Sequence, residues 1–129
     1  MNLSDVQRDI ELYFSQNWDE TPVVYQNVPY ESTEEFVRLT ILNDDRYQAS
    51  MGCTNNVYRM LGMVIVQIFS SKNIGTKRSL FLADIVISLF QSKVITNIKF
   101  KTPSVIYQGI TNIYYQLNIG CPYYIDAIQ

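Results

Sequence analysis

Two apolar blocks dominate the hydrophobic pattern of the chain, and they lie close together in its middle. The first block covers residues 60–69 and is rich in β-branched side chains, whereas the second covers residues 80–90. β-Branched residues favour strands, so the first block predicts a strand. Its apolar residues do not alternate with polar ones, which is typical of a strand covered on both faces. Gly62 inside it indicates a bulge or a close backbone approach.

The second block predicts a helix over residues 77–91. Its apolar positions form two stripes at helical spacing: Ala83, Val86, Ile87 and Phe90 in one, and Phe81, Ile85 and Leu89 in the other. A helix that is apolar around most of its circumference is usually buried on more than one side. We therefore expect Phe81, Ile85 and Leu89 to form a subunit interface, unless the N-terminal helix packs over them.

The remaining pattern predicts an N-terminal amphipathic helix over residues 3–17 and several short strands. Residues 36–42 and 113–119 alternate between apolar and polar side chains, which is typical of half-buried strands. The turn signal Asn43-Asp44-Asp45 predicts a short hairpin in which the chain returns over residues 46–52. The order of elements predicts one domain over residues 1–129. We expect an α+β fold with a mainly antiparallel sheet, and an N-terminal helix and a second helix packed on one face.

The composition favours an interaction protein. Hydrophobic residues make up 47% of the chain and charged residues 17%, below the roughly 25% of an average soluble protein. So few charges, together with ten tyrosines, indicate a surface that a partner covers, although tyrosines are also favoured in strands. The net charge is −2 and no basic stripe is visible in the sequence, so we expect no electrostatic grip on nucleic acid.

Membrane insertion and secretion are not expected. A spanning helix needs about 20 apolar residues, and both blocks are shorter and contain a polar residue, Gln67 or Asp84. Neither block stands at the N-terminus behind a basic segment, as a signal peptide would. Cys53 and Cys121 lie far apart without metal-binding spacing, so we expect reduced, buried thiols, and a single disulfide stays an alternative.

Nothing in the sequence predicts catalysis, and we expect no enzyme, no cofactor and no metal. The chain has no histidine, which removes serine–histidine and cysteine–histidine pairs and histidine metal sites. No glycine-rich phosphate-binding motif is present. Lys72, Lys77 and Arg78 cluster at the start of the second predicted helix, where an anion site is conceivable; a solvated loop is the simpler expectation.

Several segments resemble the tail-terminator (tail-completion) proteins of long-tailed bacteriophages. These are "NWDETPVVYQNVPY" after an N-terminal helix, then "FVRLTIL", "YRMLGMVIVQIF", "LADIVISLF" and "TPSVIYQGITNIYYQLNIGCPYYID". The resemblance covers nearly the whole chain and consists of the order of elements and a few short words, such as Thr21-Pro22 and Ala83-Asp84. The link "SSKNIGTK" departs from the pattern, with one glycine and added lysines.

The resemblance implies a small subunit of a homo-oligomeric ring, commonly of six copies. Such a ring sits in the virion at the head-proximal end of the tail, after assembly in the host cytoplasm. It stops polymerisation of the tail tube protein and joins the tail to a neck or connector protein. Genomic DNA passes through its lumen without specific binding. An acidic chain fits that passage, because a lumen without basic patches does not hold DNA.

Two alternatives stay open. The chain could be another neck or connector protein or a tail tube subunit, although a tube subunit needs a long hairpin arm and no such hairpin is expected here. From a different class, it could be a monomeric α+β module that binds a small apolar ligand. The side chains that would line its pocket are Tyr107, Tyr114, Tyr115, Tyr123 and Tyr124.

Overall fold

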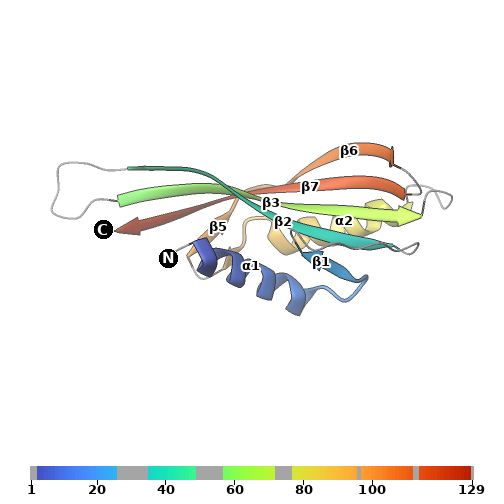
Figure 1. Cartoon of the computed structure of the whole chain (residues 1–129), viewed down its shortest axis with the longest axis horizontal. Helices are drawn as coiled ribbons and strands as arrows, with labels where there is room; N and C mark the ends of the chain where they lie inside the picture. Colours follow the sequence, from blue (N-terminus) through green and yellow to red (C-terminus); the bar gives the residue numbers. More distant parts are fainter. Residues whose placement is uncertain are drawn as a thin grey trace.

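The computed structural model describes residues 3–25, 35–48, 57–71, 77–95, 97–111 and 114–128. The elements are α1 (Leu3–Asn17), β1 (Val23–Tyr25), β2 (Phe36–Gln48), β3 (Val57–Ser71), α2 (Lys77–Phe90), β4 (Val94–Ile95), β5 (Ile98–Phe100), β6 (Ser104–Thr111) and β7 (Tyr114–Ile128). One sheet contains all the described strands, and both helices lie on the same side of it (Figure 1). The predicted α+β fold with two helices on one face is therefore confirmed.

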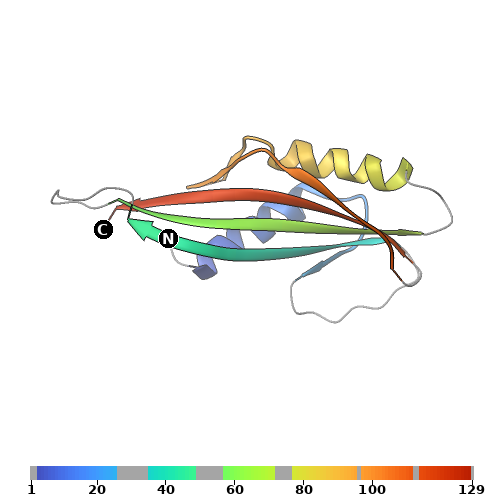
Figure 2. The ribbon, with the colours of Figure 1, turned by 90° about the horizontal axis from the view of Figure 1, so that it is seen from above.

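Three long strands form the centre of the sheet. Strand β3 pairs antiparallel with β2 on one side and with β7 on the other. The short β1 adds to β2 in parallel, while β6 and β5 pair with successive parts of the free edge of β7, and β4 pairs with β5. Seen from above, the central strands run nearly the full length of the molecule and extend past the end of α1 (Figure 2).

The hydrophobic core lies between the sheet and the two helices. Helix α1 buries Val6, Ile10 and Phe14 completely, at the three- and four-residue spacing that puts them on one helical face. Helix α2 buries its own stripe, and the rings of Phe14 and Phe90 stack at 6.1 Å between the helices. The sheet contributes its inward side chains: Val37, Leu39, Ile41, Val64, Val66, Ile68, Leu117, Ile119, Cys121, Tyr123 and Ile125.

The predicted hairpin turn at residues 43–45 is wrong. Strand β2 continues through these residues to Gln48, which pairs with Tyr58 of β3. Between Asn43 and Arg46 the register shifts, because β2 advances three residues where β3 advances two. The extra residue is a β-bulge, which absorbs the turn-forming residues without ending the strand. The β2–β3 hairpin is therefore long, contrary to the expectation.

Strand β7 continues beyond the predicted end at Ile119 and passes through Pro122. A proline has no N–H to donate, so it is rare inside a sheet. The carbonyl oxygen of Pro122 accepts a hydrogen bond from the Lys101 N–H at 2.9 Å. In an antiparallel strand the N–H and C=O of one residue point to the same neighbour. The nitrogen of Pro122 therefore points toward the segment between β5 and β6. Its lack of an N–H costs no hydrogen bond in the pairing of β7 with β3.

Candidate interaction surface

The face of the sheet opposite the helices carries apolar side chains that remain partly exposed. Burial alternates along β3: Val64, Val66 and Ile68 are fully buried, while their neighbours Met63 and Ile65 are partly exposed. Both sets are apolar, so hydrophobicity does not alternate along the sequence of β3 although burial does. Among the described elements no helix covers this face (Figure 1). We call it the open face.

The neighbouring strands extend the apolar character of the open face. The register places Leu42 of β2 and Pro122 of β7 beside Met63, and Leu42 is 45% exposed. At one end, the rings of Phe36 and Phe69 stack with their centroids 4.6 Å apart. Phe36 is itself only 5% exposed, so the apolar area left in water belongs to partly exposed side chains such as Leu42, which gain free energy on leaving water at about 25 cal/mol per Å². The open face therefore offers apolar area that folding of a single copy leaves partly in water.

A shallow groove of about 560 Å³ crosses the middle of the sheet. It is lined by Leu42, Leu61, Gly62, Met63, Lys101, Pro122 and Tyr123. A side chain at Gly62 would place its Cβ 2.3 Å from the Tyr123 ring, so this position requires glycine. The close approach that the sequence indicated at Gly62 is therefore confirmed. The groove is mostly apolar, and Lys101 supplies its positive charge.

Three cations surround the ring of Tyr124 at one end of the open face. The guanidinium of Arg59 lies 4.7 Å from the ring centroid of Tyr124, and the Nζ atoms of Lys99 and Lys101 each lie 5.6 Å from it. Cations at such distances are attracted by the electrons of the ring. Lys99 and Lys101 are exposed, and within the described residues neither forms an ion pair with a carboxylate.

Arg59 makes a bidentate ion pair across β3 and β7. Its Nε donates to Asp126 Oδ1 at 2.7 Å, and its Nη2 donates to Asp126 Oδ2 at 3.0 Å. These hydrogen bonds hold the pKa of Asp126 below its ordinary value. Arg38 adds a further cation to the open face from β2, and its Nε is buried without a hydrogen-bond partner.

This concentration of positive charge is not visible in the sequence. Arg38, Arg59 and Lys99 come from three strands, Lys101 directly follows β5, and the four residues are separated by up to 63 positions along the chain. The register brings them to one face, where Asp126 is the one acid among the described side chains. A search for consecutive basic residues cannot find such a group, since the group forms only through the order of the strands in the sheet.

Helix α2 divides the predicted interface stripe. Phe81 is 49% exposed, whereas Ile85 and Leu89 are partly buried and pack against the core. The hydroxyl of Tyr13 in α1 donates a hydrogen bond to the Leu89 carbonyl oxygen at 2.6 Å. The N-terminal helix therefore contacts the Leu89 end of the stripe, as the alternative reading anticipated, and leaves the Phe81 end on the surface.

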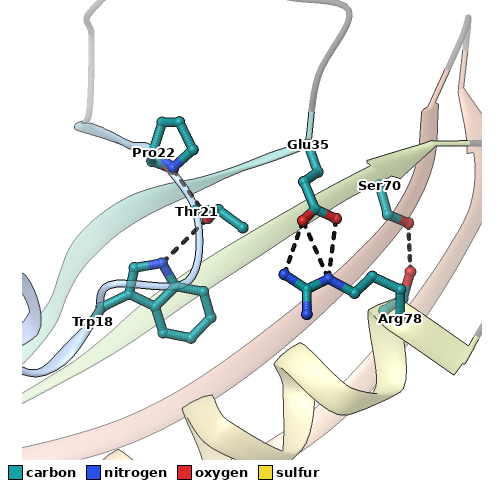
Figure 3. A network of polar contacts seen from close by, with 7 residues as sticks. Trp18, Thr21, Pro22, Glu35, Ser70 and Arg78 are labelled. Carbon is teal, nitrogen blue, oxygen red and sulfur yellow. Dashed lines mark hydrogen bonds and ion pairs between the residues drawn. The ribbon is translucent and has the colours of Figure 1, made fainter.

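The start of α2 is held by polar contacts (Figure 3). Arg78 donates from Nη2 to Glu35 Oε1 at 2.9 Å and from Nε at 3.1 Å. The buried hydroxyls of Ser70 and Ser79 are hydrogen-bonded to each other. Arg78 is thus bound to a carboxylate of the same chain, which weakens the case for an anion site there. Lys72, the third member of the predicted cluster, lies outside the described residues.

Of the tyrosines proposed for a ligand pocket, the three with described side chains do not converge. Tyr123 is 1% exposed and lies on the helix side of the sheet, where burial raises its pKa to about 12. Tyr124 is next in the strand and so points to the opposite face. Tyr115 lies near the other end of β7, paired with Ser70. The side chains of Tyr107 and Tyr114 lie outside the described residues.

Cys121 is fully buried in the sheet, and burial raises its pKa to about 12. It therefore stays a neutral thiol at physiological pH and is a poor nucleophile. Cys53 lies outside the described residues. Across the described ranges, no group of three or more histidine, cysteine, aspartate or glutamate residues could hold a metal ion. Neither described helix is long and apolar enough to cross a membrane.

Comparison with known proteins establishes the fold and nothing finer. No protein-family model matches the chain, and no curated protein matches it. One solved structure, of a protein that bears no functional name, is similar to it with a TM-score of 0.64. That match covers 92% of this chain and 94% of the other at 13% sequence identity. At such low identity the similarity concerns the architecture alone.

Proposed function

We propose that this chain is a structural protein of a bacteriophage virion. In this proposal, identical copies form a ring, of six copies by the resemblance, that caps the head-proximal end of the tail tube. The ring stops tube polymerisation and joins the tail to the neck, and genomic DNA passes through its lumen. The order of sequence landmarks supports the phage assignment. The chain acts as an assembly component, and its partners are further copies, the tail tube protein and the neck or connector protein.

The open face is the observation that carries the assembly part of the proposal. Leu42, Met63 and Ile65 form an apolar surface that the described helices do not cover. Contiguous apolar surface of this kind marks interaction sites in folded proteins. Repeated contacts between two different surfaces of identical copies close into rings when the rotation permits. Phe81 adds exposed apolar area at a separate position on α2.

Electron microscopy of particles assembled without this chain tests the proposed function. Tail tubes should overgrow in its absence, and adding the purified chain should restore a uniform tube length. Tubes of normal length that attach to heads without the chain would contradict the proposal. The readout is the distribution of tube lengths in negatively stained images.

A tail tube subunit is the second candidate, and the long β2–β3 hairpin favours it. The pairing runs from Phe36–Phe69 to Gln48–Tyr58, and the far part of the hairpin extends past α1 (Figure 2). The expected absence of such a hairpin was the reason for ranking this candidate lower. Labelling the chain in intact particles separates the two roles. A terminator is found at the head–tail joint, whereas a tube subunit is found along the whole tail.

A further inference from the structure

Charge is unevenly distributed between the two layers of the molecule. The open face carries four cations and one acid, as described above. On the helix side, residues 3–22 carry five acids and one base: Asp5, Asp9, Glu11, Asp19, Glu20 and Arg8. A chain with a net charge of −2 therefore has a positive sheet face and a negative α1 region. Such polarity is favourable for contacts between unlike faces of identical copies.

Part of the negative charge of α1 is not neutralised within the chain. Arg8 forms ion pairs with Asp5 at 3.3 Å and with Asp9 at 3.4 Å. Glu11 accepts a hydrogen bond from the neutral amide of Gln7, and within the described residues neither Glu11 nor Asp19 pairs with a cation.

Leu12, next to Glu11, is 52% exposed. A shallow groove of about 510 Å³ lies beside it and is lined by Ser4, Gln7, Arg8, Glu11, Leu12, Ser15 and Tyr25. The α1 surface therefore combines an exposed apolar side chain with unpaired acids. This is the complement of the open face, where Lys99 and Lys101 stand beside an apolar groove.

The open face is close in size to the area that one partner contributes to a specific protein interface. Strand β3 has 15 residues and therefore spans about 50 Å at a rise of roughly 3.4 Å per residue. Three strands spaced about 4.8 Å apart make the central sheet about 14 Å wide, which gives roughly 700 Å². A specific protein interface covers about 800 Å² on each partner.

We propose that the open face receives the α1 surface of a second copy of this chain, with Lys99 and Lys101 opposite Glu11 and Asp19. The α1 helix and the open face lie on opposite sides of one chain, so this contact joins different copies. It is head-to-tail, and each copy keeps one free surface of each kind for the next. The inference rests on the proposed function, since it names the contact that would build the ring.

The open face suits a protein better than a nucleic acid. Three of its cations gather around the single Tyr124 ring beside a mostly apolar groove, whereas nucleic acid requires cations that follow its phosphates along a path. Arg59 is already bound by Asp126. A partner that combines apolar and acidic side chains matches this mixture, and the α1 surface of the same chain provides both.

Charge-swapped variants of the full chain test the contact by sedimentation velocity at low salt. We expect wild-type protein to self-associate, and Lys99→Glu/Lys101→Glu and Glu11→Lys/Asp19→Lys each to weaken association at least tenfold. An equimolar mixture of the two variants should associate again, because the reversed sheet of one faces the reversed helix of the other. Asp84→Lys is the control: Asp84 is exposed on α2 and belongs to neither of the two surfaces, so association should equal wild type.

Several outcomes would overturn the inference. If the wild-type chain stays monomeric at millimolar concentration, the contact does not exist. If a folded variant with one reversed surface associates like wild type, the copies associate through a different surface. A mixture that fails to associate excludes the pairing of these two surfaces. Binding of a single-stranded oligonucleotide that is lost in Lys99→Glu/Lys101→Glu, without self-association, assigns the face to nucleic acid instead. If circular dichroism shows that a glutamate variant is unfolded, Lys99→Gln/Lys101→Gln replaces it.

The test separates this contact from the proposed function. Normal tube lengths without the chain would contradict the terminator role. The contact would still be supported if the mixture of the two variants associates. Conversely, overgrown tubes combined with charge-independent association would support the role and reject the contact.

Discussion

The two faces of β3 have nearly the same hydrophobicity and different environments. Val64 and Val66 are fully buried under the helices, whereas Met63 and Ile65 on the open face keep partial exposure. Fully burying an aliphatic side chain contributes about 1.5–3 kcal/mol. The helix side has already gained this stabilisation on folding, whereas the open side can gain part of it when a partner binds. Equal hydrophobicity can therefore serve folding on one face and association on the other.

The sharpest test of this comparison places the same charge at adjacent positions of β3. Val66→Asp should lower the free energy of unfolding by on the order of 3–5 kcal/mol, because an unpaired charge would enter the core. Ile65→Asp should lower it by less than about 2 kcal/mol, as for a partly exposed position, and should reduce self-association. Urea denaturation and light scattering measure the two effects. Equal loss of stability in both variants would mean that both faces are buried in a single copy.

Helix α2 allows the same comparison at the two ends of one stripe. Leu89→Asp should cost on the order of 2–4 kcal/mol, because Leu89 packs against the core. Phe81→Asp should cost less than about 1 kcal/mol, since this ring is 49% exposed. Thermal unfolding followed by circular dichroism separates the two. If Phe81→Asp also abolishes assembly, the exposed end of the stripe is part of an interface; unchanged assembly restricts the interface to other surfaces.

Substitutions at Gly62 and Gly120 compare how well the two faces of the sheet tolerate an added methyl group. Gly62→Ala should destabilise the fold by roughly 1–3 kcal/mol, because its Cβ would lie 2.3 Å from the Tyr123 ring and 2.7 Å from the Leu42 carbonyl oxygen. Gly120→Ala is the matched control, as its Cβ would meet the flexible Met63 sulfur at 3.3 Å. Urea midpoints of the two variants give the difference. A Gly120→Ala loss as large as that of Gly62→Ala would contradict the tolerance of the open face.

The smallest effect is expected for the ion pair on the open face. Asp126→Asn should cost about 0.2–1 kcal/mol at pH 7, since both partners are partly exposed. The pKa of Asp126 is lowered in the folded state, so this stability is fully present above the unfolded value near 3.9. It is lost as the pH falls through the lower folded pKa. Urea unfolding at pH 7 and pH 2.5 should show a smaller variant difference at the lower pH, and a constant difference would contradict this.

The sequence predicted the types of the main elements well, because their evidence is local. Helices α1 and α2 and the apolar β3 follow from spacing and composition alone, and the demand for a glycine at position 62 was foreseen. The length of β2 was missed because Asn43-Asp44-Asp45 has strong turn preferences. The pairing of β2 with β3 outweighs these preferences and converts the turn into a bulge.

The candidate interaction surface depends on long-range order, and so the sequence revealed only part of it. The excess of apolar area was expected, but on α2 instead of the open face. On α2, the Tyr13 hydroxyl donates a hydrogen bond to the Leu89 carbonyl oxygen, and its ring contacts Phe90 of the buried stripe. The cations were invisible in the sequence because Arg59 and Lys99 become neighbours only through Tyr124. Strand order and register decide which of these side chains become neighbours.

The bulge between Asn43 and Arg46 also bears on how the gene can vary in length. Because β2 carries one residue more than β3 between these pairings, a single-codon deletion at positions 44–45 would remove the surplus residue and leave the pairings on both sides unchanged. The same deletion inside β3 would reverse the orientation of every side chain beyond it. A single-residue deletion should therefore be tolerated better at this irregular step than in the regularly paired β3.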